Sequence, residues 1–165
     1  MSKTLDNLKD AFSGESQANR RYLAFAQKAD EEGYDQVAKL FRAAAAAETV
    51  HALNHIRVIG EVKSTADNLQ AAIGGETFEF TKMYPDYINQ ANKEGNKKAV
   101  NTFDLANKVE KIHAGLFKKA AENLKGEVPA VDYYVCQTCG NTVEGSAPDR
   151  CPICGAPKTG FLKVE

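Results

Sequence analysis

The feature that most limits the fold of this chain is a set of acidic side chains on stripes that are otherwise apolar. Apolar residues recur at helical spacing through four segments, residues 4–32, 35–59, 65–93 and 96–124. In each segment at least one glutamate falls on the apolar stripe, where its side chain should face the core. Four long amphipathic helices with short connections predict an all-α four-helix bundle.

Glycine and proline residues mark the limits of these helices. Glycines stand at the expected C-terminal ends, as is typical of helix caps. Pro85 and the pair Gly74–Gly75 fall inside the third segment, where they are expected to kink or loosen the helix. The capping glycines are Gly33, Gly60, Gly95 and Gly126.

The inward acids occur together with histidines, and both residue types bind metals. Two Glu-x-x-His pairs place an acid and a histidine on one helix face. A buried, unpaired carboxylate costs several kcal/mol, and lysine and arginine lie mostly off these stripes. Two iron ions carry enough positive charge to balance the acids, and imidazole nitrogen suits iron. The sequence therefore predicts a di-iron site with the candidate ligands Glu15, Glu48, His51, Glu76, Glu79, Glu110 and His113.

The two halves of the helical region resemble each other. A shift of 62 positions aligns residues 27–55 with 89–117 and superposes the two Glu-x-x-His pairs, while a shift of 61 aligns Glu15 with Glu76. Shared heptad patterning could produce similar apolar stripes, but it would not place the same acid and histidine at the same step. The bundle is therefore interpreted as a duplicated helix pair. His55 has no counterpart, so we expect it to pack or to support a ligand.

The C-terminal segment contains all four cysteines. Two Cys-x-x-Cys motifs, Cys136 to Cys139 and Cys151 to Cys154, are separated by eleven residues, a spacing that predicts one tetrahedral iron or zinc site. A segment of about 33 residues that is rich in glycine and proline buries too little apolar surface to fold without a bound metal ion. Zinc would make the segment structural, whereas iron would make it a one-electron carrier. The predicted domains are a bundle over residues 1–126, a linker over 127–132 and a cysteine domain over 133–165.

Composition excludes several classes of partner. A net charge of -1 without a basic block argues against nucleic acid and anionic membranes. No apolar run is long enough for a bilayer, and the N-terminal residues lack the pattern of a signal peptide, so we expect a cytoplasmic protein. Cysteines in such a protein more often bind metal than form disulfides.

The motifs GESQANRRY, AAETVH, GETFEFTKMYP, KVEKIH, CQTC and CPICG follow one another in an order that resembles the rubrerythrins over the whole chain. The resemblance implies a ferritin-like di-iron bundle followed by a rubredoxin-like Fe(Cys)4 domain. It also implies a non-haem di-iron peroxidase that reduces hydrogen peroxide to water in oxidative-stress defence. Its electrons would come from an NAD(P)H-dependent reductase or a rubredoxin, through the cysteine-bound iron.

The same resemblance implies roles for single residues. Glu48 and Glu110 would bridge the irons, with the other candidates as terminal ligands. One iron would move between Glu79 and His51 as its redox state changes. Because rubrerythrins place the cysteine domain beside a partner subunit's di-iron site, a homodimer, head-to-tail or swapped, is inferred by analogy.

Four further residues bear on the surroundings of the metals. Tyr22 and Tyr84 match family tyrosines near the irons and could hydrogen-bond ligand carboxylates, although core packing is the alternative role. Asn141 and Thr142 stand where rubredoxins usually carry an aromatic residue, so we expect a different cover over the four-cysteine site.

Two other functions fit part of the pattern. A ferroxidase or ferritin-like iron-handling protein would use the same bundle, but it needs no dedicated electron relay. A zinc-ribbon adaptor on a helical scaffold would leave the inward acids unexplained.

Overall fold

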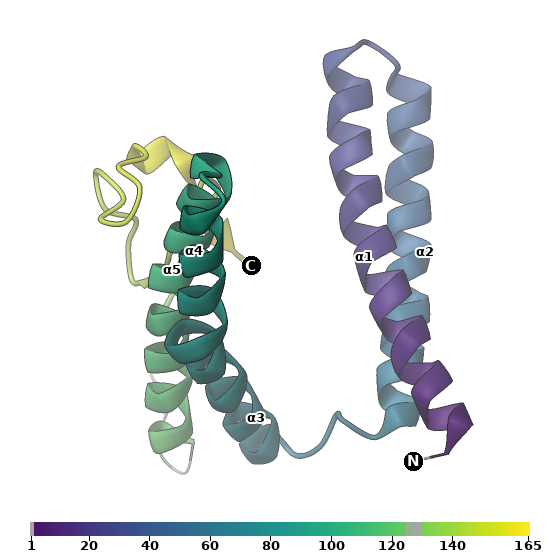
Figure 1. The fold of residues 1–165 in the computed structure, drawn as a ribbon, viewed down its shortest axis with the longest axis horizontal. Coiled ribbons are helices and arrows are strands. Elements are labelled where there is room, and N and C mark those ends of the chain that lie inside the picture. Colours follow the sequence, from purple (N-terminus) through teal and green to yellow (C-terminus); the bar gives the residue numbers. More distant parts are fainter. Residues whose placement is uncertain (1, 125, 127–129) are drawn as a thin grey trace. The chain divides into compact units, whose positions relative to one another are not determined.

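The computed structural model describes residues 2–124, 126 and 130–165, and the chain forms two compact units, residues 1–63 and 64–165. The first unit is a helical hairpin, and the second combines helices with a small sheet. Figure 1 shows the order of the elements along the chain. Within the described part of the chain, no helix is both long and apolar enough to cross a membrane.

The first unit consists of α1 (Lys3–Glu31) and α2 (Asp35–Ile59). Its helices can approach closely because the buried positions between them are mostly alanines. The side chain of Asn19 is also buried there, and its Nδ2 donates to the Ala45 carbonyl at 2.7 Å and to Thr49 Oγ1 at 2.8 Å. These bonds fix α1 against α2. The buried alanines are Ala26, Ala29, Ala38, Ala45 and Ala52.

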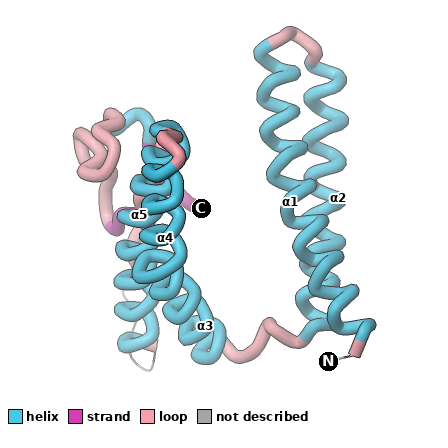
Figure 2. Tube along the Cα trace, in the orientation of Figure 1, coloured by secondary structure: helices cyan, strands magenta, loops and turns pink. Residues whose placement is uncertain are grey.

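The second unit begins with helices coloured cyan in Figure 2. They are α3 (Thr65–Phe78), the π-helical turn η1 (Glu79–Met83), α4 (Tyr84–Lys93) and α5 (Lys97–Asn123). Side chains cap two of these helices, because Ser64 Oγ accepts from the Asp67 N–H and Asn96 Oδ1 accepts from the Ala99 N–H. The predicted limits of all four helical segments agree with the structure to within a few residues.

The third predicted segment is interrupted at one place only. The glycine pair lies inside the regular α3, whereas the π-helical turn ends at Met83, two residues before Pro85. Proline lacks an N–H, and its ring crowds the carbonyl of the residue four positions earlier, which is Thr81. The wider π turn accommodates this crowding. The expectation of an irregularity is thus met at Pro85 and not at Gly74–Gly75.

The cysteine segment forms a small antiparallel sheet. Its strands are β1 (Tyr133–Cys136), β2 (Thr142–Glu144) and β3 (Phe161–Val164), in the order β2-β1-β3, with the short 3-10 helix η2 (Lys158–Gly160) before β3. Residues 127–129 of the predicted linker lie outside the described residues. The predicted domain boundaries stay a prediction.

The cysteine segment packs on α5 of its own chain. Val109 on α5 is only 2% exposed, and its Cγ1 lies 3.7 Å from where a Cβ on Gly140 would stand. Lys119 donates a hydrogen bond to Glu144 on β2. The apolar contact and the ion pair hold the sheet beside the helix that carries Glu110.

Candidate metal sites

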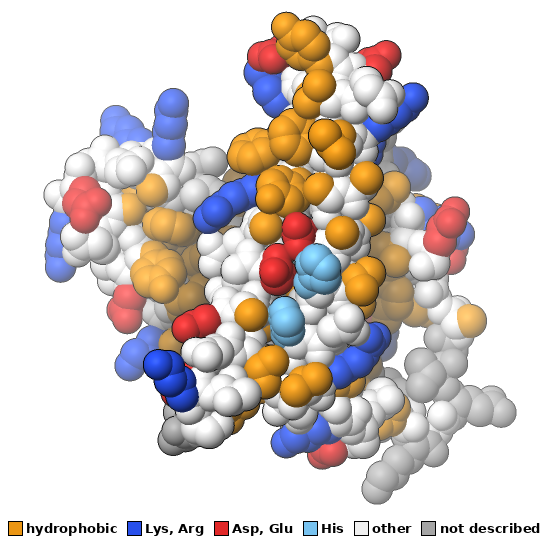
Figure 3. All heavy atoms as spheres, turned by 90° about the vertical axis from the view of Figure 1, so that its right-hand side faces the viewer, with side chains coloured by type: hydrophobic (Ala, Val, Ile, Leu, Met, Phe, Trp, Pro, Cys, Tyr) orange, Lys and Arg blue, Asp and Glu red, His pale blue; other side chains and the backbone are white. Residues whose placement is uncertain are grey.

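Among the described residues, three groups of side chains can hold a metal ion. The first, named the α1–α2 cluster, consists of Glu15, Glu48 and His51, whose ligand atoms lie within 4.8 Å of one another. His51 Nδ1 lies 2.9 Å from Glu48 Oε2. Acidic and histidine side chains lie together on this face, among hydrophobic ones (Figure 3).

The two carboxyls of the α1–α2 cluster compete for a proton. The hydrogen bond with Glu48 raises the pKa of Glu15, and the same bond, with a second from His51, lowers the pKa of Glu48. His55 acts on Glu15 as a nearby positive charge that lowers its pKa. The role expected for His55, packing or support of a ligand, stays a prediction. Acids this close together form a site for a cation.

The second group, named the α3–α5 cluster, has the same composition. Glu76, Glu110 and His113 bring their ligand atoms within 4.8 Å. His113 Nδ1 lies 2.8 Å from Glu110 Oε2 and 4.0 Å from Glu76 Oε1. Glu79 stands outside this trio but interacts electrostatically with Glu110 and His113. The cluster thus reproduces in the second unit the arrangement predicted from the sequence repeat.

Burial and mutual repulsion favour protonated acids in the α3–α5 cluster. Partial burial, followed by the hydrogen bond and charge of Glu110, raises the pKa of Glu76 to about 7. Burial and the charge of Glu110 also raise the pKa of Glu79. The pKa of Tyr84 is raised by burial and by the nearby carboxylates, so that its hydroxyl keeps its proton. A cation would relieve the repulsion among these acids.

This repulsion predicts a pH dependence for the metal-free protein. The pKa of Glu76 is about 7 in the folded state and about 4.5 in the unfolded chain, so the folded state binds more protons between these values. The free energy of unfolding should therefore fall as pH rises from about 4.5 to 7. Glu76→Gln should remove this part of the fall, whereas Glu122→Gln, at an exposed position on α5, should not. Urea unfolding of the metal-free proteins between pH 4.5 and 7 measures the free energy of unfolding at each pH. Equal slopes of this free energy against pH for wild type and Glu76→Gln would contradict the prediction.

The two tyrosines differ in their surroundings. The ring of Tyr22 lies 6.2 Å from that of Phe41 and 6.4 Å from that of Phe25, which is aromatic packing. Tyr84 packs against Phe103 and also lies near enough to the α3–α5 cluster to respond to its charges. The contacts of Tyr22 thus fit the packing role, and a supporting role for Tyr84 stays a prediction.

The third group consists of the four cysteines, all of them free thiols. Their sulfur atoms lie within 4.8 Å of one another, with 3.6 Å between the paired sulfurs, Cys136 to Cys154 and Cys139 to Cys151. Each Cys-x-x-Cys loop closes with a glycine at positive φ that donates to the carbonyl of its first cysteine. The segment therefore has the tetrahedral thiolate arrangement of a mononuclear iron or zinc site.

Backbone N–H groups stabilise the thiolates. Burial raises the pKa of Cys151, but the N–H groups of Cys154 and Ile153, together with hydrogen bonds from the side chains of Cys154 and Cys139, outweigh it and bring that pKa to about 7. The pKa of Cys139 is raised, mainly by burial, although the Asn141 N–H acts in the opposite direction. The side chain of Asn141, 1% exposed, directs its Nδ2 to Cys151 Sγ at 3.7 Å. Asn141 therefore covers the sulfurs where the sequence predicted a different cover.

The donor atoms present fit the predicted metals. Each helical cluster offers carboxylate oxygens and one imidazole nitrogen, the donor types of non-haem iron sites. Four thiolates suit one iron or zinc ion. A bound cation would also neutralise the close pairs of acids, Glu15 with Glu48 and Glu76 with Glu110.

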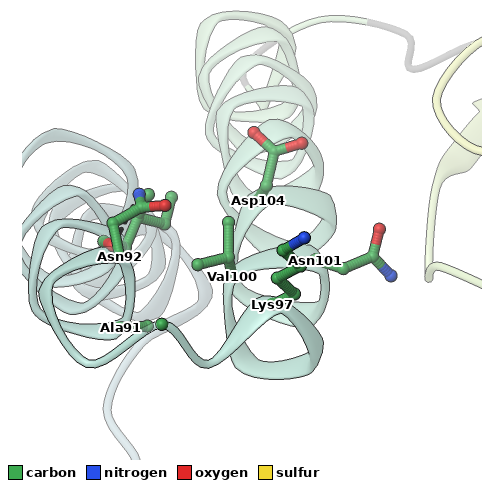
Figure 4. Close-up of a pocket in the computed structure, with 8 residues that line it drawn as sticks. Ala91, Asn92, Lys97, Val100, Asn101 and Asp104 are labelled. Atoms are coloured by element: carbon green, nitrogen blue, oxygen red, sulfur yellow. Dashed lines mark hydrogen bonds between the residues drawn. The ribbon is translucent and has the colours of Figure 1, made fainter.

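Two of the cavities among the described residues of the second unit bear on where further metal ligands could lie. Figure 4 shows one of about 370 Å³ where α4 meets α5, lined by Asn92, Asn101 and Asp104 among others. Asp104 is paired with Lys108 at 2.6 Å, so this cavity offers no unpaired carboxylate among its lining residues. The other, of about 500 Å³, is lined by Glu76 and His113 together with apolar side chains and Thr142, and so adjoins the α3–α5 cluster.

Comparison with known proteins decides the family. A family model for rubrerythrin matches residues 6–121, and a model for the rubrerythrin rubredoxin-like domain matches residues 134–161. The chain belongs to the rubrerythrin family. The two matches fall on either side of the predicted linker, and the family match confirms the cofactors, a di-iron carboxylate site and a four-cysteine iron site.

The similarity to individual rubrerythrins extends over nearly the whole chain. The chain is 37% identical to Rubrerythrin-2 of Clostridium acetobutylicum, covering 96% of this chain and 95% of that protein. It is 36% identical to nigerythrin of Nitratidesulfovibrio vulgaris, with coverages of 96% and 85%. A solved structure described as the fully reduced, all-ferrous state of nigerythrin matches with a TM-score of 0.60 and 35% identity, covering 99% of this chain and 88% of that one. The predicted fold class, a ferritin-like helical region followed by a rubredoxin-like domain, is confirmed.

One contact of this rubrerythrin was missed by sequence reasoning. Thr142 Oγ1 lies 3.0 Å from His113 Nε2, so a residue of the cysteine segment touches a candidate ligand of the α3–α5 cluster. The sequence did mark Thr142 as a departure from the rubredoxin pattern, which was the available signal. Nothing in the spacing of residues 29 positions apart indicated its partner.

Proposed function

We propose that this chain reduces hydrogen peroxide to water at a di-iron site, with electrons that pass through the four-cysteine iron. The observation that carries the proposal is the presence in one chain of two equivalent carboxylate and histidine clusters and one thiolate cluster. Rubrerythrins form an oxidoreductase family, and the donors found here support the more specific reaction.

In this proposal the α1–α2 and α3–α5 clusters are the two halves of one di-iron site. Each supplies two carboxylates and one histidine, which is too few ligands to complete the coordination of an iron ion by itself. The sequence repeat gives the halves matching donors, as expected for two irons related by a pseudo-twofold axis. Glu79, the remaining acid, has no partner in the repeat and would be an additional ligand on one side.

Reduction of hydrogen peroxide to two waters takes two electrons and two protons. A pair of ferrous ions bound at the site would supply the two electrons. The two protons would come from solvent water. Glu48 and Glu110 would hold the metals, and the hydroxyl of Tyr84 can donate a hydrogen bond to an oxygen near the carboxylates. The acids of the α3–α5 cluster are partly buried, which reduces the amount of water around the reacting atoms.

The thiolate site would return electrons to the bundle after each turnover. Four sulfur donors stabilise ferrous and ferric iron in nearly the same geometry, so the site can carry one electron at a time. An NAD(P)H-dependent reductase or a rubredoxin is the proposed donor. A cytoplasmic homodimer is part of the same proposal, by analogy with the family.

The proposal is tested by the fate of peroxide. The anaerobically reduced protein should consume about one hydrogen peroxide per di-iron site and produce water, and it should react faster with peroxide than with oxygen. Stopped-flow absorbance with each oxidant makes the comparison. A faster reaction with oxygen, together with a cage-sized native assembly on a sizing column, would instead favour the ferroxidase or ferritin-like alternative.

A further inference from the structure

The contact between Thr142 and His113 joins the cysteine segment to the α3–α5 cluster. We propose that Thr142 is a positioning residue that holds the His113 ring for metal binding and couples this histidine electronically to the cysteine-bound iron. The proposal rests on the proposed function, because the coupling has a use only if electrons move between the two metal sites.

The hydrogen bonds of Thr142 fix the direction of the contact. Thr142 Oγ1 donates its single proton to the Gly140 carbonyl at 3.2 Å. Towards His113 Nε2, at 3.0 Å, the same oxygen can therefore only accept, which requires a proton on Nε2. Nδ1 faces Glu110 Oε2 at 2.8 Å and Glu76 Oε1 at 4.0 Å, so a metal held by these acids would meet the ring at Nδ1. An Nε2–H held by Thr142 keeps the ring in the orientation that this binding needs.

On the other side, Thr142 is directly bonded to the residue that covers the thiolates. The Asn141 N–H donates to the sulfur of Cys139, and the Asn141 carbonyl accepts from the Cys136 N–H at 2.9 Å. A bonded route from the Cys139 sulfur to the His113 ring thus crosses two hydrogen bonds and the covalent bonds between Asn141 and the Thr142 side chain. It contains no gap across open solvent.

The surrounding packing keeps this route in place. Val109, one turn before His113 on α5, is buried against Gly140, and Lys119 pairs with Glu144 at the end of β2. Tyr133 OH also donates to Glu144, at 3.3 Å. Because contacts on both sides of Thr142 hold the sheet against α5, the hydroxyl and the ring remain within bonding distance.

Two substitutions separate the role of the hydroxyl from the shape of the side chain. Thr142→Val keeps the shape and removes the hydroxyl, whereas Thr142→Ser keeps the hydroxyl. If Thr142 only fills space, Thr142→Val should be harmless and Thr142→Ser should be the worse variant. If Thr142 acts through its hydrogen bond to His113, Thr142→Ser should be harmless and Thr142→Val should be the worse variant.

The kinetic test follows both metal sites in one experiment. The fully reduced holoprotein is mixed with a small excess of hydrogen peroxide. A fast phase reports oxidation of the di-iron pair, and a later return of red absorbance reports the electron that leaves the cysteine-bound ferrous iron for the oxidised pair. We expect the red phase to be about tenfold slower in Thr142→Val. Removing the hydrogen-bond partner of a metal-binding histidine typically lowers metal affinity or activity by about 10- to 100-fold, and this expectation takes the low end. Thr142→Ser should match wild type. Glu110→Ala serves as the baseline for direct attack of peroxide on the cysteine site.

A structural readout does not depend on turnover. In protein loaded with zinc alone, the Nε2 proton of His113 should exchange slowly with solvent in wild type and Thr142→Ser, and rapidly in Thr142→Val, as measured by NMR of the imidazole ¹⁵N–H. Equal red phases and equal exchange in the two variants would overturn the inference. Failure of wild type to oxidise its di-iron pair with peroxide would instead refute the proposed function, and the exchange measurement would still decide the role of Thr142.

Discussion

Replacing Glu110 by alanine will remove both irons from the helical region and leave the red spectrum of the four-cysteine site intact. Glu110 is central to the α3–α5 cluster, because it contacts His113 at 2.8 Å and shares a hydrogen bond with Glu76. The iron content should fall from three to one per chain. Peroxide reduction should fall at least about 100-fold, the upper end of what loss of an outer partner of a metal ligand costs.

The iron count also decides whether the two clusters form one site. If they are halves of one di-iron site, Glu48→Ala and Glu110→Ala should each leave one iron per chain. If they are independent, each variant should lose a single iron and retain two. Glu122→Ala is the matched control, because Glu122 is an exposed glutamate on the same helix. Metal analysis and visible spectra of reconstituted protein give the count, and normal iron binding by Glu110→Ala would show that the ligand assignment is wrong.

The features that sequence reasoning predicted best depend on local chain geometry. The limits of α1, α2 and α5 follow from apolar periodicity and from the glycines at the helix ends, such as Gly60, which ends α2 at a positive φ. The two Glu-x-x-His pairs were predictable for the same reason, since residues three apart share a helix face whatever the rest of the chain does.

The features that were missed depend on competition or on packing between distant segments. The position of the π turn reflects a balance between helix hydrogen bonds and the ring of Pro85. Apolar periodicity contains no information on this balance, so it does not predict where the helix becomes irregular. The bond between His113 and Thr142 exists because the sheet is held on α5 by Val109 and Lys119. Such contacts join sequence positions whose relation appears only after folding. The sequence therefore predicts the ligands but not their supporting partners.

Zinc in place of iron at the cysteines will separate electron relay from structural support. Zinc binds four thiolates in the same tetrahedral geometry but has no redox chemistry. A chain with zinc at Cys136, Cys139, Cys151 and Cys154 and with ferrous iron in the helical region should keep its sheet packed on α5. A single turnover with stoichiometric peroxide should then be as fast as in the all-iron protein. Steady-state turnover driven by a reductase should be largely abolished, because the oxidised pair is no longer supplied with electrons.

Deletion of residues 130–165 is the necessary comparison, because it removes the relay and the packing together. The deletion exposes Val109 and leaves His113 without Thr142, so the single turnover should be slower than in the zinc form. If the cysteine domain is only a structural support, the zinc form should keep full steady-state activity and the deletion alone should lose it. If it is a relay, both forms lose steady-state activity, and only the zinc form keeps the fast single turnover. Coupled assays and stopped-flow oxidation of the two proteins distinguish these outcomes, and full coupled activity with zinc would show that electrons enter the di-iron site by another route.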